Sequence, residues 1–282
     1  MTDFFPFRSG PSRVPNLGGM DEPAAEVPLS GGTLNRVVRA GDTVRRSAGP
    51  WTATIHALLR HLRDEGFGLA PEPFGLDTSG REVLGFIPGA TVGWSLPWPQ
   101  WIRSDDMLRE VGRATAEFHR AVASFRPQGA PPWRFGPAPV AEGQIVCHND
   151  LAPYNVVVDQ GRLVGLIDWD LAGPGRPISD LAFVAWQWVP LHGLRISSLM
   201  GWGDVDRAAR LRLLLDSYGL TEREGFIEAV RDRIGRNRST MIEQAALGDP
   251  AYQALVDAGH IAGMDTALTF IDAEGPALQA AI

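Results

Sequence analysis

The sequence predicts an α+β fold in two lobes, a small β-rich N-terminal lobe followed by a larger, mainly helical C-terminal lobe. Three observations predict it. Short strands joined by tight turns come first, helical apolar stripes dominate the later part, and 282 residues suffice for two lobes of ordinary size. We expect an N-terminal arm at 1–25, which is rich in proline and glycine, an N-terminal lobe at 26–90 and a C-terminal lobe at 91–282.

The N-terminal lobe is expected to be a small sheet with one helix. A first strand near residue 26 is followed by a turn and by two strands that meet in a tight hairpin at Gly41-Asp42. The first turn consists of Ser30, Gly31 and Gly32. The helix comes next and ends at Gly66, and its apolar stripe is Ile55, Leu58, Leu59 and Leu62. A last strand runs into Pro88-Gly89, the candidate hinge between the lobes.

The C-terminal lobe opens with a long core helix. Ser104 is placed to cap it, because Asp105 and Asp106 then fall in the first turn, where the helix dipole favours acids. The apolar stripe of this helix contains Leu108, Val111, Thr115, Phe118, Val122 and Phe125. A proline-rich loop and a hairpin around Asp159-Gln160-Gly161 follow, and from Asp180 onward the pattern is helical.

The amino-acid composition limits the kinds of partner and compartment that the protein is expected to have. A net charge of −7 argues against nucleic acid, and no apolar run is long enough to span a membrane. The single Cys147 excludes an internal disulfide and, with no signal peptide in view, favours the cytoplasm. All 26 basic residues are arginine, a pattern typical of mutational bias in a GC-rich genome. Chemistry that commonly uses lysine must therefore use arginine here or proceed without a lysine. The oligomeric state is not readable from the sequence.

The residues with the clearest chemical meaning lie at 148–170. His148, Asp150 and Asn155 form the pattern H-x-D-x-x-x-x-N, and after the hairpin comes Asp168-Trp169-Asp170. Transfer of a γ-phosphoryl group needs Mg²⁺, a hard cation that prefers oxygen ligands. Asn155 and Asp168 can supply those oxygens, and Asp150 is then left to accept the proton of the attacking hydroxyl. In this interpretation, a divalent cation bound together with a polyphosphate balances the negative charge of the acids at the strand ends.

A structural alternative exists for each of these residues. Asp and Asn also favour turns, so Asp150 and Asn155 could cap loops and Asp168 could end a strand. The four matching positions in a strand–loop–hairpin context favour the catalytic interpretation. We interpret His148 as structural support, because Asp150 already fills the position of the base. Asp170 could contact a second metal or be a solvated loop acid.

These residues carry a resemblance to a known family. The segment VCHNDLAPYNVVVD…GLIDWDLAGPGRPISDLAFV resembles the aminoglycoside phosphotransferases, small-molecule kinases related to choline and homoserine kinases. The resemblance implies a protein-kinase-like two-lobe fold, Asp150 as base, and Asn155 and Asp168 as Mg²⁺ ligands. It further implies that Asp180 braces the loop after the metal ligand. Asn149 stands where protein kinases have arginine, which argues against a protein substrate.

The same resemblance locates an ATP (or GTP) site. Ser30, Gly31 and Gly32 correspond to the loop over the phosphates, where missing Cβ atoms let backbone N–H groups approach. In the strand DTVRR, Val44 aligns with the roof of the site and Arg46 with the phosphate-binding lysine, with Arg45 pointing away. Residues 47–63 contain no acid to pair with Arg46, so that either His56 or a more distant acid takes this place, or Arg46 has no such partner. Adenine would lie at the hinge, at Phe86 and Ile87.

The acceptor is expected to be a small molecule with a hydroxyl group. After Arg238 the chain has six acids and no basic residue, which could attract a cationic compound such as an aminoglycoside or be a solvated helix face. These acids are Glu243, Asp249, Asp257, Asp265, Asp272 and Glu274. The leading hypothesis is an O-phosphotransferase. The alternative is a pseudokinase that binds a nucleotide or sequesters an antibiotic, as an immunity protein would, without phosphoryl transfer.

Overall fold

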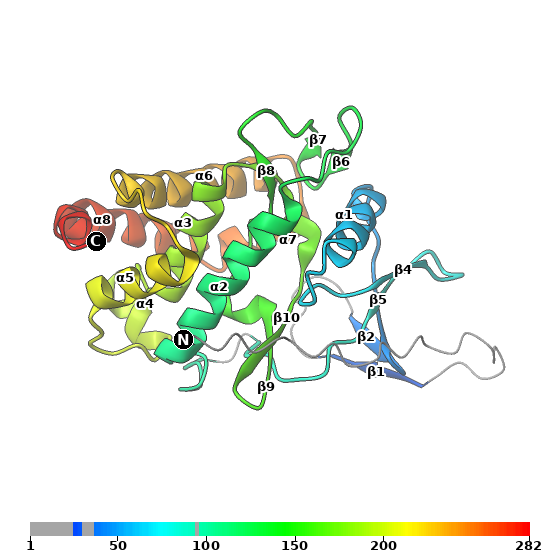
Figure 1. The fold of residues 1–282 in the computed structure, drawn as a ribbon, viewed down its shortest axis with the longest axis horizontal. Coiled ribbons are helices and arrows are strands. Elements are labelled where there is room, and N and C mark those ends of the chain that lie inside the picture. The colour runs from blue at the N-terminus through cyan, green and yellow to red at the C-terminus, as the bar shows by residue number, and fades with distance from the viewer. Residues whose placement is uncertain (1–24, 30–36, 94–95) are drawn as a thin grey trace, which may run out of the picture.

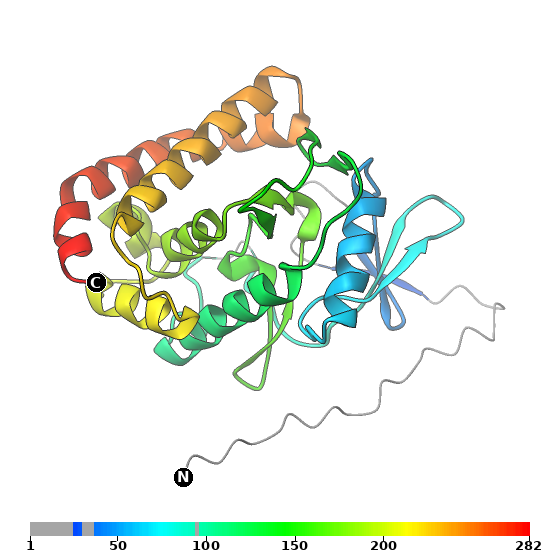
Figure 2. The same ribbon diagram turned by 45° about the horizontal axis from the view of Figure 1, so that its top comes forward.

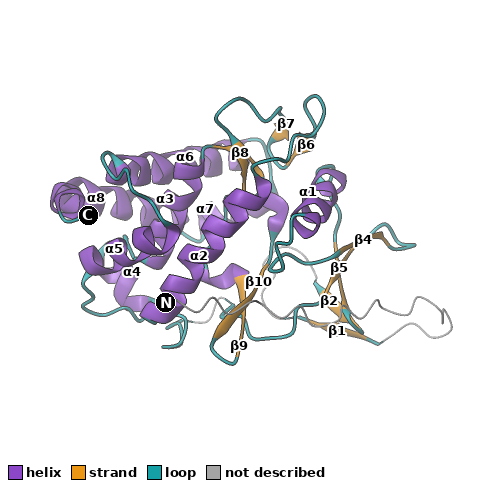
Figure 3. Cartoon of the chain, in the orientation of Figure 1, coloured by secondary structure: helices purple, strands orange, loops and turns teal. Residues whose placement is uncertain are grey.

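The computed structural model describes residues 25–29, 37–93 and 96–282. They form a small lobe with an antiparallel sheet and a larger, mainly helical lobe (Figures 1 and 3). The arm before residue 25 and the turn residues Ser30, Gly31 and Gly32 lie outside the described part.

The small lobe is a five-stranded antiparallel sheet beside one helix. Its strand order is β1-β2-β3-β5-β4, and the strands are β1 (Glu26–Pro28), β2 (Val38–Ala40), β3 (Thr43–Arg46), β4 (Pro73–Leu76) and β5 (Glu82–Gly85). Helix α1 (Thr52–Asp64) lies beside the sheet, and its predicted stripe of Ile55, Leu58, Leu59 and Leu62 is buried. The hairpin at Gly41-Asp42 is confirmed. Strand β4 was not predicted, because Pro73 and Gly75 interrupt the strand pattern.

The hinge at Pro88-Gly89 lies against the large lobe. Ala90 exchanges two backbone hydrogen bonds with Val158, with N···O distances of 2.8 and 2.9 Å. Gly89 has φ +149°, and a Cβ atom there would lie 2.6 Å from the Val157 side chain. Only glycine permits this approach, so the connection between the lobes is fastened directly to β9.

Helix α2 (Asp105–Val122) organises the large lobe. Ser104 caps it as predicted, since its Oγ accepts a hydrogen bond of 3.1 Å from the amide of Met107. The expected stripe is buried, but α2 ends at Val122, so Phe125 lies beyond the helix. Gly112 allows close packing against α5, because a Cβ there would lie 2.8 Å from Ser217 Cβ.

The rest of the large lobe combines three two-stranded antiparallel sheets with helices. The strands are β6 (Pro132–Trp133), β7 (Gly136–Pro137), β8 (Ile145–Cys147), β9 (Val156–Asp159), β10 (Arg162–Leu166) and β11 (Gly173–Gly175), with 3-10 turns at Pro153–Asn155 and Trp169–Leu171. The helices are α3 (Pro177–Trp188), α4 (Leu194–Leu199), α5 (Arg207–Tyr218), α6 (Phe226–Ala246), α7 (Pro250–Asp257) and α8 (His260–Ala280). Helices α6 and α8 run side by side (Figures 1 and 2). Among the described residues, no helix is long and apolar enough to span a membrane.

Candidate active site

Residues from both lobes line a cavity of about 1640 Å³. Its apolar wall includes Leu29, Val44, Leu84, Val157 and Ile167. The predicted hinge residues Phe86 and Ile87 also line it. The amide of Phe86 already donates to the carbonyl oxygen of Asp42 at 2.9 Å. The Phe86 amide, one of the groups expected to contact adenine, is therefore already hydrogen-bonded within the small lobe.

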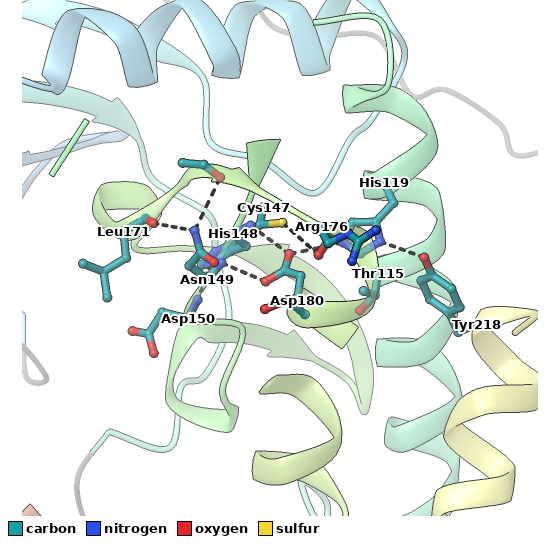
Figure 4. Close-up of polar contacts among 12 residues, drawn as sticks. Thr115, His119, Cys147, His148, Asn149, Asp150, Leu171, Arg176, Asp180 and Tyr218 are labelled. Carbon is teal, nitrogen blue, oxygen red and sulfur yellow. Dashed lines mark hydrogen bonds and ion pairs between the residues drawn. The ribbon is translucent and has the colours of Figure 1, made fainter. Parts of the chain in front are cut away.

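The predicted catalytic loop begins at His148 and is held by Asp180 at the start of α3 (Figure 4). Asp180 Oδ2 and Oδ1 accept hydrogen bonds from the amides of His148 and Asn149, each at 2.9 Å. Oδ2 also lies 3.2 Å from His119 Nε2. Burial alone would raise the pKa of Asp180, but the hydrogen bond from His119 and nearby positive charge lower it to about 2.

The loop after Asp168 is braced differently from the sequence expectation, which assigned this role to Asp180. Asn149 Nδ2 donates to the carbonyl oxygen of Leu171 at 3.0 Å, whereas Asp180 binds the catalytic loop itself. Asn149 has φ 66°, a left-handed conformation that asparagine tolerates better than most residues. Its side chain thus joins the catalytic loop to the segment that follows the predicted metal ligand.

His148 is packed rather than exposed to the cavity. Its side chain is buried, its ring lies 4.5 Å from that of Trp169, and its Nδ1 accepts a hydrogen bond of 3.3 Å from the Asp150 amide. Burial lowers the pKa of His148. These contacts favour the structural role expected for this histidine.

Asp150 lies in the cavity with its carboxylate pointing away from Asp180 (Figure 4). Its Oδ2 accepts from Asn155 Nδ2 at 2.8 Å, and its Oδ1 accepts from the Tyr154 hydroxyl at 3.2 Å. Removal from water, followed by the charge of Asp168, raises the pKa of Asp150 to about 8. With this pKa the carboxyl group is mainly protonated at neutral pH, and the ionised fraction, which can accept a proton, increases as pH rises towards 8.

Asn155 and Asp168 lie next to each other although twelve residues separate them along the hairpin. The Ile167 amide donates to the carbonyl oxygen of Asn155 at 3.0 Å, which brings Asp168 beside it. Asp168 has φ 60°, and its side chain is 52% exposed, so its carboxylate is accessible from the cavity. The two predicted metal ligands are therefore both at the cavity wall.

Arg46 enters the same site from β3. Its guanidinium donates to Glu82, to Asp168 at 3.1 Å and to Asp170 at 2.6 Å. Arg46 and Glu82 are both buried. Burial alone would lower the pKa of Arg46, but Asp170, Asp168 and Glu82 raise it above its usual value. The arginine thus connects the small lobe to the acids of the large lobe.

Glu82 is the acid partner that sequence reasoning did not identify. It stands directly opposite Arg46 in the pairing of β3 with β5, and His56 of α1 lies 2.9 Å from its other oxygen. Burial acts to raise the pKa of Glu82, but His56 and Arg46 together lower it. His56 and a more distant acid both take part, which are the two substitutes the sequence left open. Arg45 points away and pairs with Glu26.

The charges of this site fit a divalent cation. Three carboxylates share the single Arg46 guanidinium, and burial keeps the pKa of Asp170 raised although Arg46 opposes this. Within the described ranges, no three His, Cys, Asp or Glu side chains form a metal site by themselves. Two oxygen ligands, Asn155 and Asp168, instead suit Mg²⁺ that is bound jointly with phosphate oxygens.

Replacing Asp180 with asparagine is expected to destabilise the fold by about 2 kcal/mol at neutral pH. The lowered pKa of Asp180 means that its stabilisation is present above its unfolded value of 3.8 and is lost as pH falls towards 2. Urea unfolding of both proteins as a function of pH tests this. A stability difference that stays constant down to the lowest pH would contradict it.

The sequence of this chain is similar to that of known proteins. Residues 133–214 match the phosphotransferase enzyme family APH. Over 211 residues, the chain is 41% identical to the trifolitoxin immunity protein of Rhizobium leguminosarum bv. trifolii, with 72% of this chain and 78% of that protein covered.

The fold is similar to that of solved kinases. A choline/ethanolamine kinase family protein from Mesorhizobium loti gives a TM-score of 0.59 at 19% identity, over 95% of each chain. An amicoumacin kinase in complex with AMP-PNP and Ca²⁺ gives 0.61 at 12% identity, over 92% of this chain and 89% of that one. These likenesses confirm the kinase-like two-lobe fold.

Proposed function

Because the chain belongs to the phosphotransferase enzyme family APH, we propose that it transfers the γ-phosphoryl group of ATP (or GTP) to a hydroxyl group of a small molecule. The observation that carries the proposal is the convergence of Asp150, Asn155 and Asp168 with Arg46 of the other lobe on one cavity. Use of ATP is also the reason to propose a cytoplasmic location.

Asp150 is the proposed general base. The hydroxyl oxygen of the acceptor forms a bond to the γ-phosphorus, the bond from that phosphorus to the nucleoside diphosphate breaks, and the hydroxyl proton passes to Asp150. Asn155 and Tyr154 orient the Asp150 carboxylate through their hydrogen bonds. Mg²⁺, when bound at Asn155 and Asp168, would neutralise phosphate charge. The glycine turn at Ser30–Gly32 and the hinge at Phe86 and Ile87 are the proposed contacts for phosphates and base.

Arg46 is proposed to help bind the phosphates. A guanidinium has five N–H donors, and three of its nitrogens already donate to carboxylates. Its position is therefore set by Glu82, Asp168 and Asp170 before any nucleotide binds. Such fixed positioning reduces the reorganisation needed at the moment of reaction.

The proposed acceptor class follows from the family, with an aminoglycoside as its cationic example. The basis for a cationic acceptor is the acidic segment after Arg238, and among those acids Asp249 lines the cavity. Asp249 is already paired with Arg134. This acid therefore gives no free negative charge for a cationic acceptor.

A second candidate function is immunity through binding alone. It is favoured by the 41% identity to a protein named for immunity against trifolitoxin. In that case the chain would sequester a toxic compound and the phosphotransferase residues would serve only binding. The two functions differ in whether Asp150 is needed.

Mg·ATP is expected to raise the melting temperature of the wild-type protein by about 5 °C at saturating concentration, since a ligand that binds the folded state stabilises it. Asp168→Ala should lose this shift, because one of the two metal ligands is gone. Asp159→Ala, at the exposed end of strand β9 in the same hairpin, should keep it. The proposal fails if nucleotide gives no shift, or if Asp168→Ala and wild type respond alike.

A further inference from the structure

Three arginines on the cavity wall form no ion pair with any described residue. They are Arg176, Arg233 and Arg236. The other arginines of this wall, Arg46 and Arg134, are each paired with carboxylates. We call these three residues the arginine wall.

Arg233 ties the arginine wall to the catalytic loop. It is 7% exposed and extends from α6 to Asn149, where Nη1 donates to Oδ1 at 2.9 Å and Nη2 to the carbonyl oxygen at 2.7 Å. Asn149 immediately precedes Asp150. A positive charge is thus fixed one residue away from the proposed base.

Arg236 brings a second positive charge to the same place. Its Nη2 donates to Ser179 Oγ at 2.8 Å, and Arg233 Nη1 lies 3.4 Å from that same oxygen. Burial lowers the pKa of Arg233 most, and the charge of Arg236 lowers it further, although Asp180 opposes this. Two guanidinium groups therefore share one neutral hydroxyl.

The surroundings carry charge of both signs, because the buried carboxylate of Asp180, the residue after Ser179, attracts Arg233. Ser179 lies in the first turn of the twelve-residue helix α3, whose N-terminal end carries partial positive charge. Asp249, the cavity-lining acid of the C-terminal segment, is occupied by Arg134 and by capping α7. Arg233 and Arg236 outnumber the one carboxylate of Asp180, and two guanidinium groups at the cavity favour binding of an anion.

We propose that the acceptor carries a carboxylate, which binds at Arg233, Arg236 and Ser179 while its hydroxyl group lies at Asp150. A guanidinium group matches a carboxylate through two parallel N–H donors, and the exposed Arg236 can offer such a pair. Arg233, whose terminal nitrogens bind Asn149, adds positive charge, so that together they would fix the position and the charge of the acceptor. This inference rests on the proposed function for its hydroxyl group, but the anion site itself does not depend on nucleotide.

Three probes with one carbon skeleton test the charge preference: gluconate, uncharged gluconamide and cationic glucamine. Each is titrated into the nucleotide-free protein at constant ionic strength, and the melting temperature is recorded. We expect gluconate to raise it and the other two to leave it unchanged. A larger rise with glucamine would assign a cationic acceptor and overturn the inference, and so would the absence of any rise with gluconate.

Variants on helix α6 locate the site. Arg236→Gln removes an exposed charge and is expected to weaken gluconate binding by at least about tenfold, through loss of a charge-assisted contact. Arg231→Gln is the matched control, because Arg231 pairs with Asp272 on the exposed surface of the same helix. Equal gluconate affinity in wild type and Arg236→Gln would overturn the assignment. Failure here leaves the Mg·ATP shift intact, whereas failure of the proposed function removes that shift.

Discussion

Asp150→Asn is expected to lower phosphoryl transfer by about 10²–10⁴-fold, the usual contribution of a general base. Asparagine can still bond to Asn155 and Tyr154 but cannot accept the hydroxyl proton. Nucleoside diphosphate release with an accepted substrate measures the effect. Mg·ATP should still raise the melting temperature of the variant, because Asn155 and Asp168 are unchanged.

The Asp150→Asn variant should be at least as stable as the wild type above neutral pH. The pKa of Asp150 is raised to about 8 in the folded protein, so the folded state holds its proton longer than the unfolded chain does. Stability contributed by this group therefore falls as pH rises from the unfolded pKa towards 8. Loss of turnover would thus not reflect unfolding. If the variant retains full turnover, Asp150 is not the base; retained protection against a toxin without turnover would favour immunity through binding.

Arg46→Ala is expected to reduce the free energy of unfolding by about 3–5 kcal/mol, the usual effect of removing one partner of a buried ion pair. The reason is Glu82, a carboxyl group that is 1% exposed and would be left buried without its guanidinium partner. Asp168 adds little to this figure, because its side chain is half exposed and water screens its charge. Urea unfolding at neutral pH measures the loss.

Two further variants test whether the effect of Arg46 on stability depends on its place in the strand or on its positive charge alone. Arg45→Ala, on the opposite side of the same strand, should change stability by less than about 1 kcal/mol, because its pair with Glu26 is partly exposed. Arg46→Lys keeps a positive charge but lacks the planar fork that reaches three carboxylates, so it should remain less stable than the wild type. Equal stability of Arg46→Ala and Arg45→Ala would contradict the role assigned to Glu82.

Elements of the fold could be predicted from the sequence where a local pattern of residues determines the structure of that element. The stripe of α1, the cap of α2 at Ser104 and the hairpin at Asp159-Gln160-Gly161 are local patterns, and all three are confirmed. Strand β4 was missed because Pro73 and Gly75 obscure its pattern. Its place in the sheet depends on pairing with β5, a contact between segments.

In the candidate site, likewise, residues close together in the sequence could be predicted to meet, whereas contacts between distant segments could not. Asp150, Asn155 and Asp168 lie within one hairpin and its loop, so their spacing predicted that they would meet. Glu82 is brought to Arg46 by the register of β3 and β5, which no spacing in the sequence reveals. Arg233 reaches Asn149 from 84 residues away, through the packing of α6 against α3. Contacts of this kind become visible only in the folded chain.

The direct test of phosphoryl transfer is to follow the γ-phosphoryl group itself. The protein is incubated with Mg²⁺, ATP labelled with ¹⁸O at the γ-phosphate, and a mixture of hydroxylated antimicrobial compounds and hydroxy acids, and the products are analysed by mass spectrometry. We predict a phosphate ester that carries the label and forms with the wild type but not with Asp150→Asn. Binding of Mg·ATP without any labelled ester would contradict phosphoryl transfer and leave immunity through binding as the better account.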